Sequence, residues 1–290
     1  MNRLLQLIFV CLAFSALAFA QETSAPQALS VSPRDLARAK SLSGFAYVDS
    51  KVFTCNGQSF QIPRFRHKQT ELMFHLVPGG RYLRGSSARE TVRIKSEGPV
   101  REVSIQPFLI CATECTQAAW KSVVGAEPSK HSGAERPVER VSWIEVQGFC
   151  GKAGLRLPSE AEWEFACRAG AKSAYSFGDD PGALGRYAEF KNNSRGEPKS
   201  VAGKAPSAFG LHDMHGNVLE WCQDAWAGTY QDAPETGWPA RKGSIRGSLR
   251  VVRGGSFWSG SARCRSAARS SYGPGAHRLD LGFRPAKSLP

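Results

Sequence analysis

The most informative stretch of the chain is Gly210-Leu-His-Asp-Met-His-Gly-Asn-Val-Leu-Glu-Trp221. Asp213 and Glu220 supply two carboxylates. In an extended segment, carbonyls two residues apart point the same way, so those of Gly216 and Val218 can face one ion. Calcium takes about six to eight oxygen ligands of these two kinds, which makes the stretch a candidate calcium site. The alternative is a turn in which Asp213 caps backbone amides and Glu220 bonds to the backbone.

Three further motifs accompany this stretch. They are Leu155-Arg-Leu-Pro-Ser-Glu-Ala-Glu-Trp-Glu-Phe-Ala-Cys-Arg168 upstream, and Arg253-Gly-Gly-Ser-Phe257 and Leu281-Gly-Phe-Arg284 downstream. In this order, the four motifs resemble those of the formylglycine-generating enzyme (sulfatase-modifying factor) family. The resemblance implies an α+β fold, namely an elaborated C-type-lectin-like domain with short helices, short strands and many loops.

The first 20 residues have the pattern of a secretory signal peptide. Arg3 provides the positive charge, residues 4–17 are nearly all apolar, and Ala18-Phe-Ala20 is a cleavage site before Gln21. The alternative is a membrane anchor, but the apolar run is too short to span a bilayer comfortably. We therefore expect an exported protein, periplasmic or secreted, with no membrane span after cleavage.

Residues 21–70 are predicted to form an N-terminal leader, and residues 71–290 the family-like domain. In the leader, Ser32-Pro33 predicts the start of a helix, with serine as the N-cap and proline in the first turn. Asn56-Gly57 predicts a small hairpin, because aromatic and β-branched residues flank it on both sides.

Three short helices are predicted within the domain. Thr116 caps the first, and capping boxes begin the other two at Ser142 and Ser159. Gly170 is expected to end the third helix. Beyond Ala171 no helical pattern is visible, and glycine, proline and polar residues predominate. This second half is therefore expected to consist of long loops and short strands.

The charge and the cysteine content restrict the partners and the compartment. The formal net charge is +13, which favours an acidic partner, and a peptide or protein substrate is the partner that the family resemblance implies. We do not expect nucleic acid as a partner, because no recognised nucleic-acid-binding motif accompanies the charge.

Of eight cysteines, Cys11 lies in the signal peptide, so seven remain in the mature chain. We expect disulfides, because export places the chain in an oxidising compartment. The odd number of cysteines leaves at least one thiol without an intramolecular partner.

The resemblance also indicates where the family carries out its chemistry. In formylglycine-generating enzymes, a cysteine three residues after Gly-Gly-Ser and a second one five residues later together hold Cu(I), which prefers soft thiolates. Here the first of these positions is Ser259. A hydroxyl is a poor Cu(I) ligand, so copper is not expected. Ser256, Ser259 and Cys264 are the candidate catalytic residues.

Cys264 has two possible identities. Counted forward from Ser256 it matches the second copper cysteine. Counted backward from Ala267-Ala-Arg-Ser270, it lies two residues before a structural cysteine of the family, which pairs with the position of Cys167. A disulfide between Cys167 and Cys264 is the favoured interpretation. An inert buried thiol and a reactive thiol are the alternatives.

The resemblance implies structural calcium at Asp213, Gly216, Val218 and Glu220. A second family calcium site falls in the loop between residues 187 and 200, which is short here. Its candidate ligands are Glu189, Asn192 and Asn193, together with Glu114. A solvated loop without a metal is the alternative.

Aromatic residues and arginines are dense in the last quarter of the chain. Aromatic residues that could line a groove near Ser256 are Trp226, Tyr230, Trp238, Trp258 and Tyr272. Residues of this kind more often belong to a core. Arginines that could attract an acidic ligand are Arg246, Arg250, Arg253, Arg263, Arg265 and Arg269. Arg269 and Arg284 belong to the motifs themselves and are expected to bond loop carbonyls.

Three functions are consistent with these observations, of which the first is the preferred one and the second its alternative. The first is an exported oxidative-maturation enzyme that modifies a peptide or protein without a copper dithiolate, as in the pyoverdine-maturation branch of the family. The second is a non-catalytic binding module, because the same fold displays variable ligand-binding loops in retroelement systems. The third is a true formylglycine generator, which Ser259 disfavours. Whether the protein is an enzyme stays open at this point.

Overall fold

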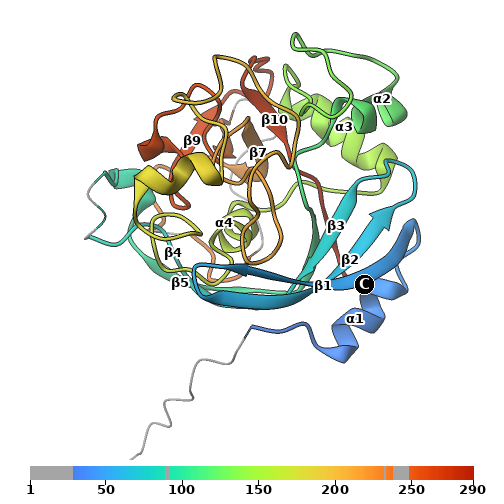
Figure 1. Cartoon of the computed structure of the whole chain (residues 1–290), viewed down its shortest axis with the longest axis horizontal. Helices are drawn as coiled ribbons and strands as arrows, with labels where there is room; N and C mark the ends of the chain where they lie inside the picture. The colour runs from blue at the N-terminus through green and yellow to red at the C-terminus, as the bar shows by residue number, and fades with distance from the viewer. Residues whose placement is uncertain (1–28, 89, 91, 232, 238–247) are drawn as a thin grey trace, which may run out of the picture.

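The computed structural model describes residues 29–88, 90, 92–231, 233–237 and 248–290 (Figure 1). The predicted signal peptide, Trp238 and Arg246 lie outside the described residues. Within the described part, no helix is both long enough and apolar enough to cross a membrane. The fold is α+β, with short helices and short strands, as predicted.

The N-terminal segment contains the predicted helix and hairpin. Helix α1 (Pro33–Lys40) begins where the Asp35 amide donates a hydrogen bond to the Ser32 hydroxyl at 3.1 Å. Strands β1 (Phe45–Cys55) and β2 (Gln58–His67) pair antiparallel on either side of Asn56-Gly57, where both residues have positive φ. Both predictions are confirmed. The hairpin also pairs with the following strand, so it shares a sheet with the rest of the domain.

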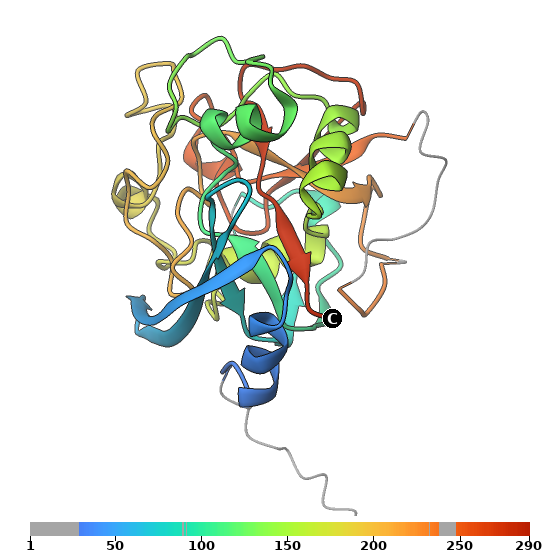
Figure 2. The same cartoon turned by 90° about the vertical axis from the view of Figure 1, so that its right-hand side faces the viewer.

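A five-stranded antiparallel sheet joins the two ends of the described chain. Its order is β1-β2-β3-β6-β11, with β3 at Met73–Val77, β6 at Phe108–Cys111 and β11 at Ala286–Ser288. Figures 1 and 2 show α1 and the C-terminus close to the same side of this sheet.

The strands on either side of Pro78-Gly-Gly80 lie in two different sheets. Strand β4 (Gly80–Arg84) leaves β3 and pairs with β5 (Arg101–Ile105) instead. A β-carbon on Gly79 would lie 2.7 Å from the Pro107 ring and 2.8 Å from the Ile105 carbonyl oxygen. Only glycine therefore fits at this corner between the sheets.

The three predicted helices begin at the predicted caps. They are α2 (Gln117–Val124), α3 (Trp143–Ala153) and α4 (Glu160–Arg168). Both capping boxes are formed, at Ser142 and at Ser159. Helix α4 ends at Ala169 in the left-handed conformation, one residue before the predicted Gly170.

The second half of the chain consists of loops around a small sheet, as predicted. The sheet order is β10-β7-β8-β9, with strands at Leu219–Ala225 (β7), Arg250–Arg253 (β8), Arg269–Tyr272 (β9) and Leu281–Phe283 (β10). Strand β10 runs parallel to β7. Three short 3₁₀ helices complete the elements: η1 (Lys95–Glu97), η2 (Pro181–Arg186) and η3 (Ser261–Arg263).

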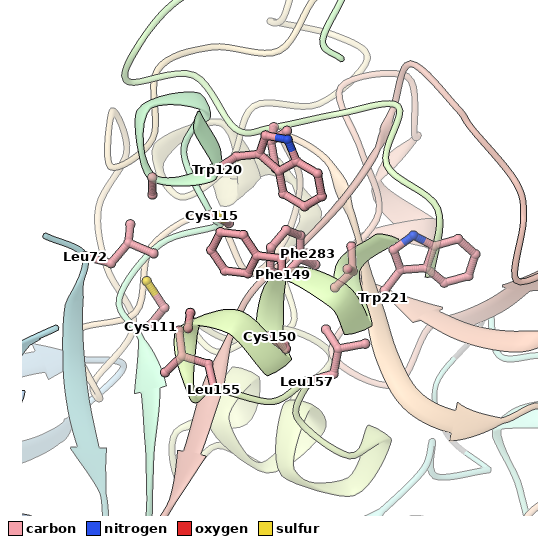
Figure 3. Close-up of a cluster of buried hydrophobic side chains, with 14 of the residues drawn as sticks. Leu72, Cys111, Cys115, Trp120, Phe149, Cys150, Leu155, Leu157, Trp221 and Phe283 are labelled. Carbon is pink, nitrogen blue, oxygen red and sulfur yellow. The ribbon is translucent and has the colours of Figure 1, made fainter. Parts of the chain in front are cut away.

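Aromatic side chains from α2, α3 and β10 build one part of the core (Figure 3). The Trp120 and Phe149 rings stack with centroids 5.4 Å apart, and the Phe283 ring meets the Phe149 ring edge-on at 5.2 Å. Cys111, Cys115 and Cys150 are buried in this same cluster. Burial raises the pKa values of these three thiols, which therefore behave as small apolar side chains.

Candidate functional site

Two buried carboxylates of helix α4 organise the region around the candidate site. Figure 1 shows α4 near the middle of the molecule, between the four-stranded sheet and the β4–β5 pair. Glu160 accepts hydrogen bonds from Arg84 at 2.6 Å and from Arg269 at 2.7 Å. Burial alone would raise the pKa of Glu160, but the guanidinium groups of Arg269, Arg84 and Arg253 lower it to about 2. Glu160 is therefore ionised at neutral pH.

Glu164 lies one turn further along the helix and holds a second set of partners. Arg253 donates to one of its oxygens at 2.5 Å, and Arg168 donates to the other at 3.0 Å. The Gly85 amide donates to the same oxygen as Arg168, at 2.8 Å. Because a buried charge without a partner is very costly, these contacts hold the chain segments of Gly85 and Arg253 against α4, which itself carries Arg168.

Arg253 connects this ionic network to the Arg253-Gly-Gly-Ser-Phe257 motif. Its guanidinium also donates to the carbonyls of Ser266, Ala267 and Ala268, at 2.9, 2.9 and 2.7 Å. The start of the motif is thereby fixed to the loop that precedes β9. Arg269 bonds loop carbonyls as predicted, and so does Arg284, which donates to the carbonyls of Cys111 and His212.

A pocket of about 350 Å³ opens beside this motif. Its walls come from the motif, from η3 and from strands β8 and β9 with the segment before β10. The lining residues that carry polar or aromatic groups are Arg253, Ser256, Trp258, Ser259, Arg263, Arg269, Ser270, Tyr272, Arg278 and Asp280. Pockets for small ligands typically begin at about 300 Å³, so this one can hold one or two side chains of a ligand.

The two predicted serines lie together in the pocket, with a carboxylate that the sequence analysis missed. The Ser256 hydroxyl donates to Asp280 Oδ2 at 3.1 Å, and the Ser256 amide donates to Ser259 Oγ at 3.0 Å. The other oxygen of Asp280 accepts a hydrogen bond from Arg278 Nε at 2.9 Å. The position of Asp280, directly before Leu281-Gly-Phe-Arg284, was the available signal for its role.

Cys264, the third candidate catalytic residue, does not line the pocket. It is fully buried behind Gly255, where an added β-carbon would lie 2.8 Å from the Cys264 sulfur. Burial raises the pKa of Cys264 to about 12, so the thiolate is strongly disfavoured at neutral pH. Gly255 also has a φ of +71°, and both features require glycine there.

Cys167 and Cys264 both contact His215. His215 Nδ1 donates to the Cys264 carbonyl at 2.7 Å, and Nε2 lies 3.8 Å from the Cys167 sulfur. His215 is buried, and burial lowers its pKa to about 4, so the ring is neutral. All seven cysteines in the described residues are free, so the expected bridge between Cys167 and Cys264 is not formed in this structure.

The Cys167–Cys264 disulfide stays a prediction for the exported, oxidised protein. We expect non-reducing peptide mapping to recover the two cysteines in one linked peptide pair. Such a bridge would stabilise the fold by about 4.7 kcal/mol in the chain-entropy model, because it closes a loop of about 100 residues. Recovery of Cys264 as a freely alkylated thiol from protein unfolded under non-reducing conditions would reject it.

The two acidic residues of the predicted calcium site, Asp213 and Glu220, belong to a group of buried carboxylates. Asp213 Oδ2 accepts a hydrogen bond from the Ala202 amide at 2.8 Å. Glu220 accepts from Arg284 at 2.8 Å and from the Trp163 indole at 2.6 Å. Both oxygens of the Glu220 carboxylate therefore already accept hydrogen bonds from protein groups.

Glu114 joins this group rather than the loop at residues 187–200. Its carboxylate accepts hydrogen bonds from the Val218 amide and the Asn217 side chain, both at 3.3 Å. Burial and the neighbouring carboxylates of Asp213 and Glu220 raise the pKa of Glu114 well above its usual range. Burial also raises the pKa of Asp213 to about 6.

These shifts bear on whether calcium fits. Three buried carboxyl groups share the single guanidinium of Arg284, so a bound cation would relieve their mutual repulsion. Hard oxygen donors are also the kind that calcium prefers. In the described part of the chain, however, no three acidic, histidine or cysteine side chains converge on one point. The groups available to coordinate a cation here would be the carboxylates of Asp213 and Glu114 and the backbone carbonyls of Gly216 and Val218.

The candidates for the second calcium site have different surroundings in the structure. Glu189 pairs with Lys204 at 3.4 Å, and Asn192 is exposed. The Asn193 side chain closes a turn by bonding to the backbone of Phe190 and Ala188. Glu189 and Asn193 thus bond to protein groups, and the second calcium site stays a prediction.

Calcium at the first site is tested by chelation. We expect EGTA to lower the melting temperature of the wild-type protein, because a ligand that binds only the folded state stabilises it by about 2.7 kcal/mol at a concentration of 100 Kd. Asp213→Ala should lower the melting temperature and abolish the EGTA effect. Asp49→Ala, which removes a surface ion pair with Arg64, is the matched control and should keep the effect. An unchanged melting temperature of the wild type in EGTA would contradict the calcium assignment.

The predicted aromatic groove is smaller than expected. Trp258, which is 45% exposed, and Tyr272 line the pocket. Trp226 and the buried Tyr230 instead lie against the Arg269 guanidinium, 4.2 and 4.3 Å from it to their ring centroids. These two rings belong to the ionic network.

The fold and the motifs define the class of protein. Two solved structures share the C-type-lectin-like α+β fold. PvdO from Pseudomonas aeruginosa is 26% identical with a TM-score of 0.72, over 78% of this chain and 98% of PvdO. Treponema denticola variable protein 1 is also 26% identical with a TM-score of 0.66, over 83% of this chain and 99% of that protein.

The sequence comparison identifies the family. Residues 60–289 match the sulfatase-modifying factor enzyme 1-like domain. The chain is 30% identical to the formylglycine-generating enzyme of Streptomyces coelicolor, over 72% of this chain and 87% of that enzyme. It is 28% identical to that of Thermomonospora curvata, over 78% of this chain and 97% of that enzyme. The protein belongs to the formylglycine-generating enzyme (sulfatase-modifying factor) family.

Proposed function

We propose that this protein is an exported binding domain of the family, which holds a peptide segment of its partner in the pocket beside Ser256. The observation that carries the proposal is the composition of the pocket walls. An exposed indole at Trp258 and the Tyr272 ring provide apolar contact, while the hydroxyls of Ser256 and Ser259 provide hydrogen bonds. Sites that combine aromatic surface with a few fixed polar groups are typical of peptide recognition.

The groups available for chemistry also favour binding. Of the described residues that line the pocket, none is a cysteine or a histidine. The hydroxyl of Ser259 stands at the position of the first copper cysteine, and the Cys264 thiol is buried with a raised pKa. The pocket is therefore well supplied with binding groups and poorly supplied with soft metal ligands.

Oxidative maturation of the bound peptide is the second candidate. It is favoured by the location of the pocket, which lies on the segment where the family resemblance locates the chemistry. The two candidates differ in one measurement. A captured peptide incubated with the protein in air should keep its mass if the protein only binds, and should change mass if the protein oxidises it.

The proposed function is tested with a library of acetylated, amidated hexapeptides passed over the purified protein. Captured peptides are identified by mass spectrometry, and their affinity is then measured by fluorescence anisotropy. Trp258→Ala should weaken binding by about 30-fold, the usual effect of removing a central aromatic contact. Ile144→Ala, at an exposed apolar residue of α3, is the matched control and should bind as the wild type does. Failure to capture any peptide, or equal loss in both variants, would contradict the proposal.

A further inference from the structure

We propose that the pocket selects a carboxylate-bearing side chain, so that the bound peptide carries an aspartate or glutamate held by Arg263 and Arg278. This inference rests on the proposed function and names the class of its ligand. It starts from the charges that remain without a partner at the pocket once the ion pairs of its walls are taken into account.

The Arg263 guanidinium is the most available charge in the pocket. Arg263 is the last residue of η3, and it is exposed. Its side chain forms no hydrogen bond or ion pair with any residue that the structure describes. The backbone is nevertheless fixed, because the Arg263 amide donates to the Gly260 carbonyl at 2.9 Å and the Arg263 carbonyl packs against Gly255. A fixed backbone with a free guanidinium is suited to a ligand.

Arg278 provides a second guanidinium in a defined orientation. Its Nε donates to Asp280, and its central carbon lies 4.6 Å from the centroid of the Tyr272 ring. Stacking on an aromatic ring fixes the plane of a guanidinium group. The two terminal nitrogens of Arg278 form no hydrogen bond within the described part of the chain. They remain able to donate to both oxygens of one carboxylate.

The other charges of the walls are already compensated. Arg253 and Arg269 are held by Glu164 and Glu160. Asp280 is the one carboxylate among the described lining residues, and both of its oxygens are engaged by Arg278 and Ser256.

A ligand carboxylate would therefore meet the free guanidinium of Arg263 and the two free terminal nitrogens of Arg278, while both oxygens of Asp280 are already engaged. A lysine or arginine side chain would meet the same groups as like charges. The pocket thus favours an acidic peptide over a basic one.

The test uses three peptides of the form acetyl-Gly-Ala-X-Ala-Gly-amide, in which X is glutamate, glutamine or lysine. Blocked ends make the side chain of X the only difference, since glutamate and glutamine have nearly the same shape. The wild-type protein should bind the glutamate peptide about tenfold more tightly than the glutamine peptide, the usual gain from a hydrogen bond to a charged group. The lysine peptide should bind most weakly.

Arg263→Gln should remove most of the preference for glutamate, measured as the ratio of the affinities for the glutamate and glutamine peptides. Arg34→Gln is the matched control, since it removes the same charge from an exposed position on α1, which Figure 1 shows on the side of the molecule away from β9. This control should keep the preference.

Three results would overturn the inference while the proposed function stands. The first is equal binding of the glutamate and glutamine peptides by the wild type, with both lost in Trp258→Ala. The second is an equal loss of preference in Arg263→Gln and Arg34→Gln, which would mean that only overall charge matters. The third is competition by inorganic phosphate at concentrations similar to those of the glutamate peptide, because the site would then recognise any anion. If no peptide binds, the proposed function itself fails.

Discussion

The structure depends on two ionised carboxylates, Glu160 and Glu164, that are buried on one helix and can be tolerated there only with guanidinium partners. Three of their partners, Arg84, Arg253 and Arg269, come from other places in the chain, and the fourth, Arg168, lies on α4 itself. Removal of one partner from a buried pair typically costs about 3–5 kcal/mol, because the remaining charge is left in a low-dielectric interior. The chain segments that carry these arginines are thereby required to meet at α4.

This requirement explains how a loop-rich half of a protein holds a defined pocket. Arg253 is both a partner of Glu164 and the first residue of the segment that contains Ser256 and Ser259. The glycines that follow it allow the chain to pass directly over Cys264. Asp280 then fixes the Ser256 hydroxyl from the other wall. The pocket is therefore positioned by ionic and polar contacts more than by regular secondary structure.

The sequence predicted local structure well, because local structure has local causes. The capping boxes at Ser142 and Ser159 and the turn at Asn56-Gly57 each involve residues within a few positions of one another, and all are present. The family motifs also led to the correct fold. What the sequence did not reveal was long-range: the departure of β4 from β3, the pairing of Glu220 with Arg284, and the approach of Asp280 to Ser256. A carboxylate in a motif does not show whether a cation or an arginine will face it.

Hydrogen exchange of Glu164→Gln tests most directly whether the ionic network positions the pocket. The substitution keeps the shape of the side chain and removes the charge that holds Arg253. Amides of residues 253–259 should exchange faster than in the wild type, while those of α3 keep their protection. Glu102→Gln, which removes an exposed pair with Arg81, should exchange as the wild type does. Unchanged protection of residues 253–259 in Glu164→Gln would contradict the account, because the pocket segment would then be held without the carboxylates of α4.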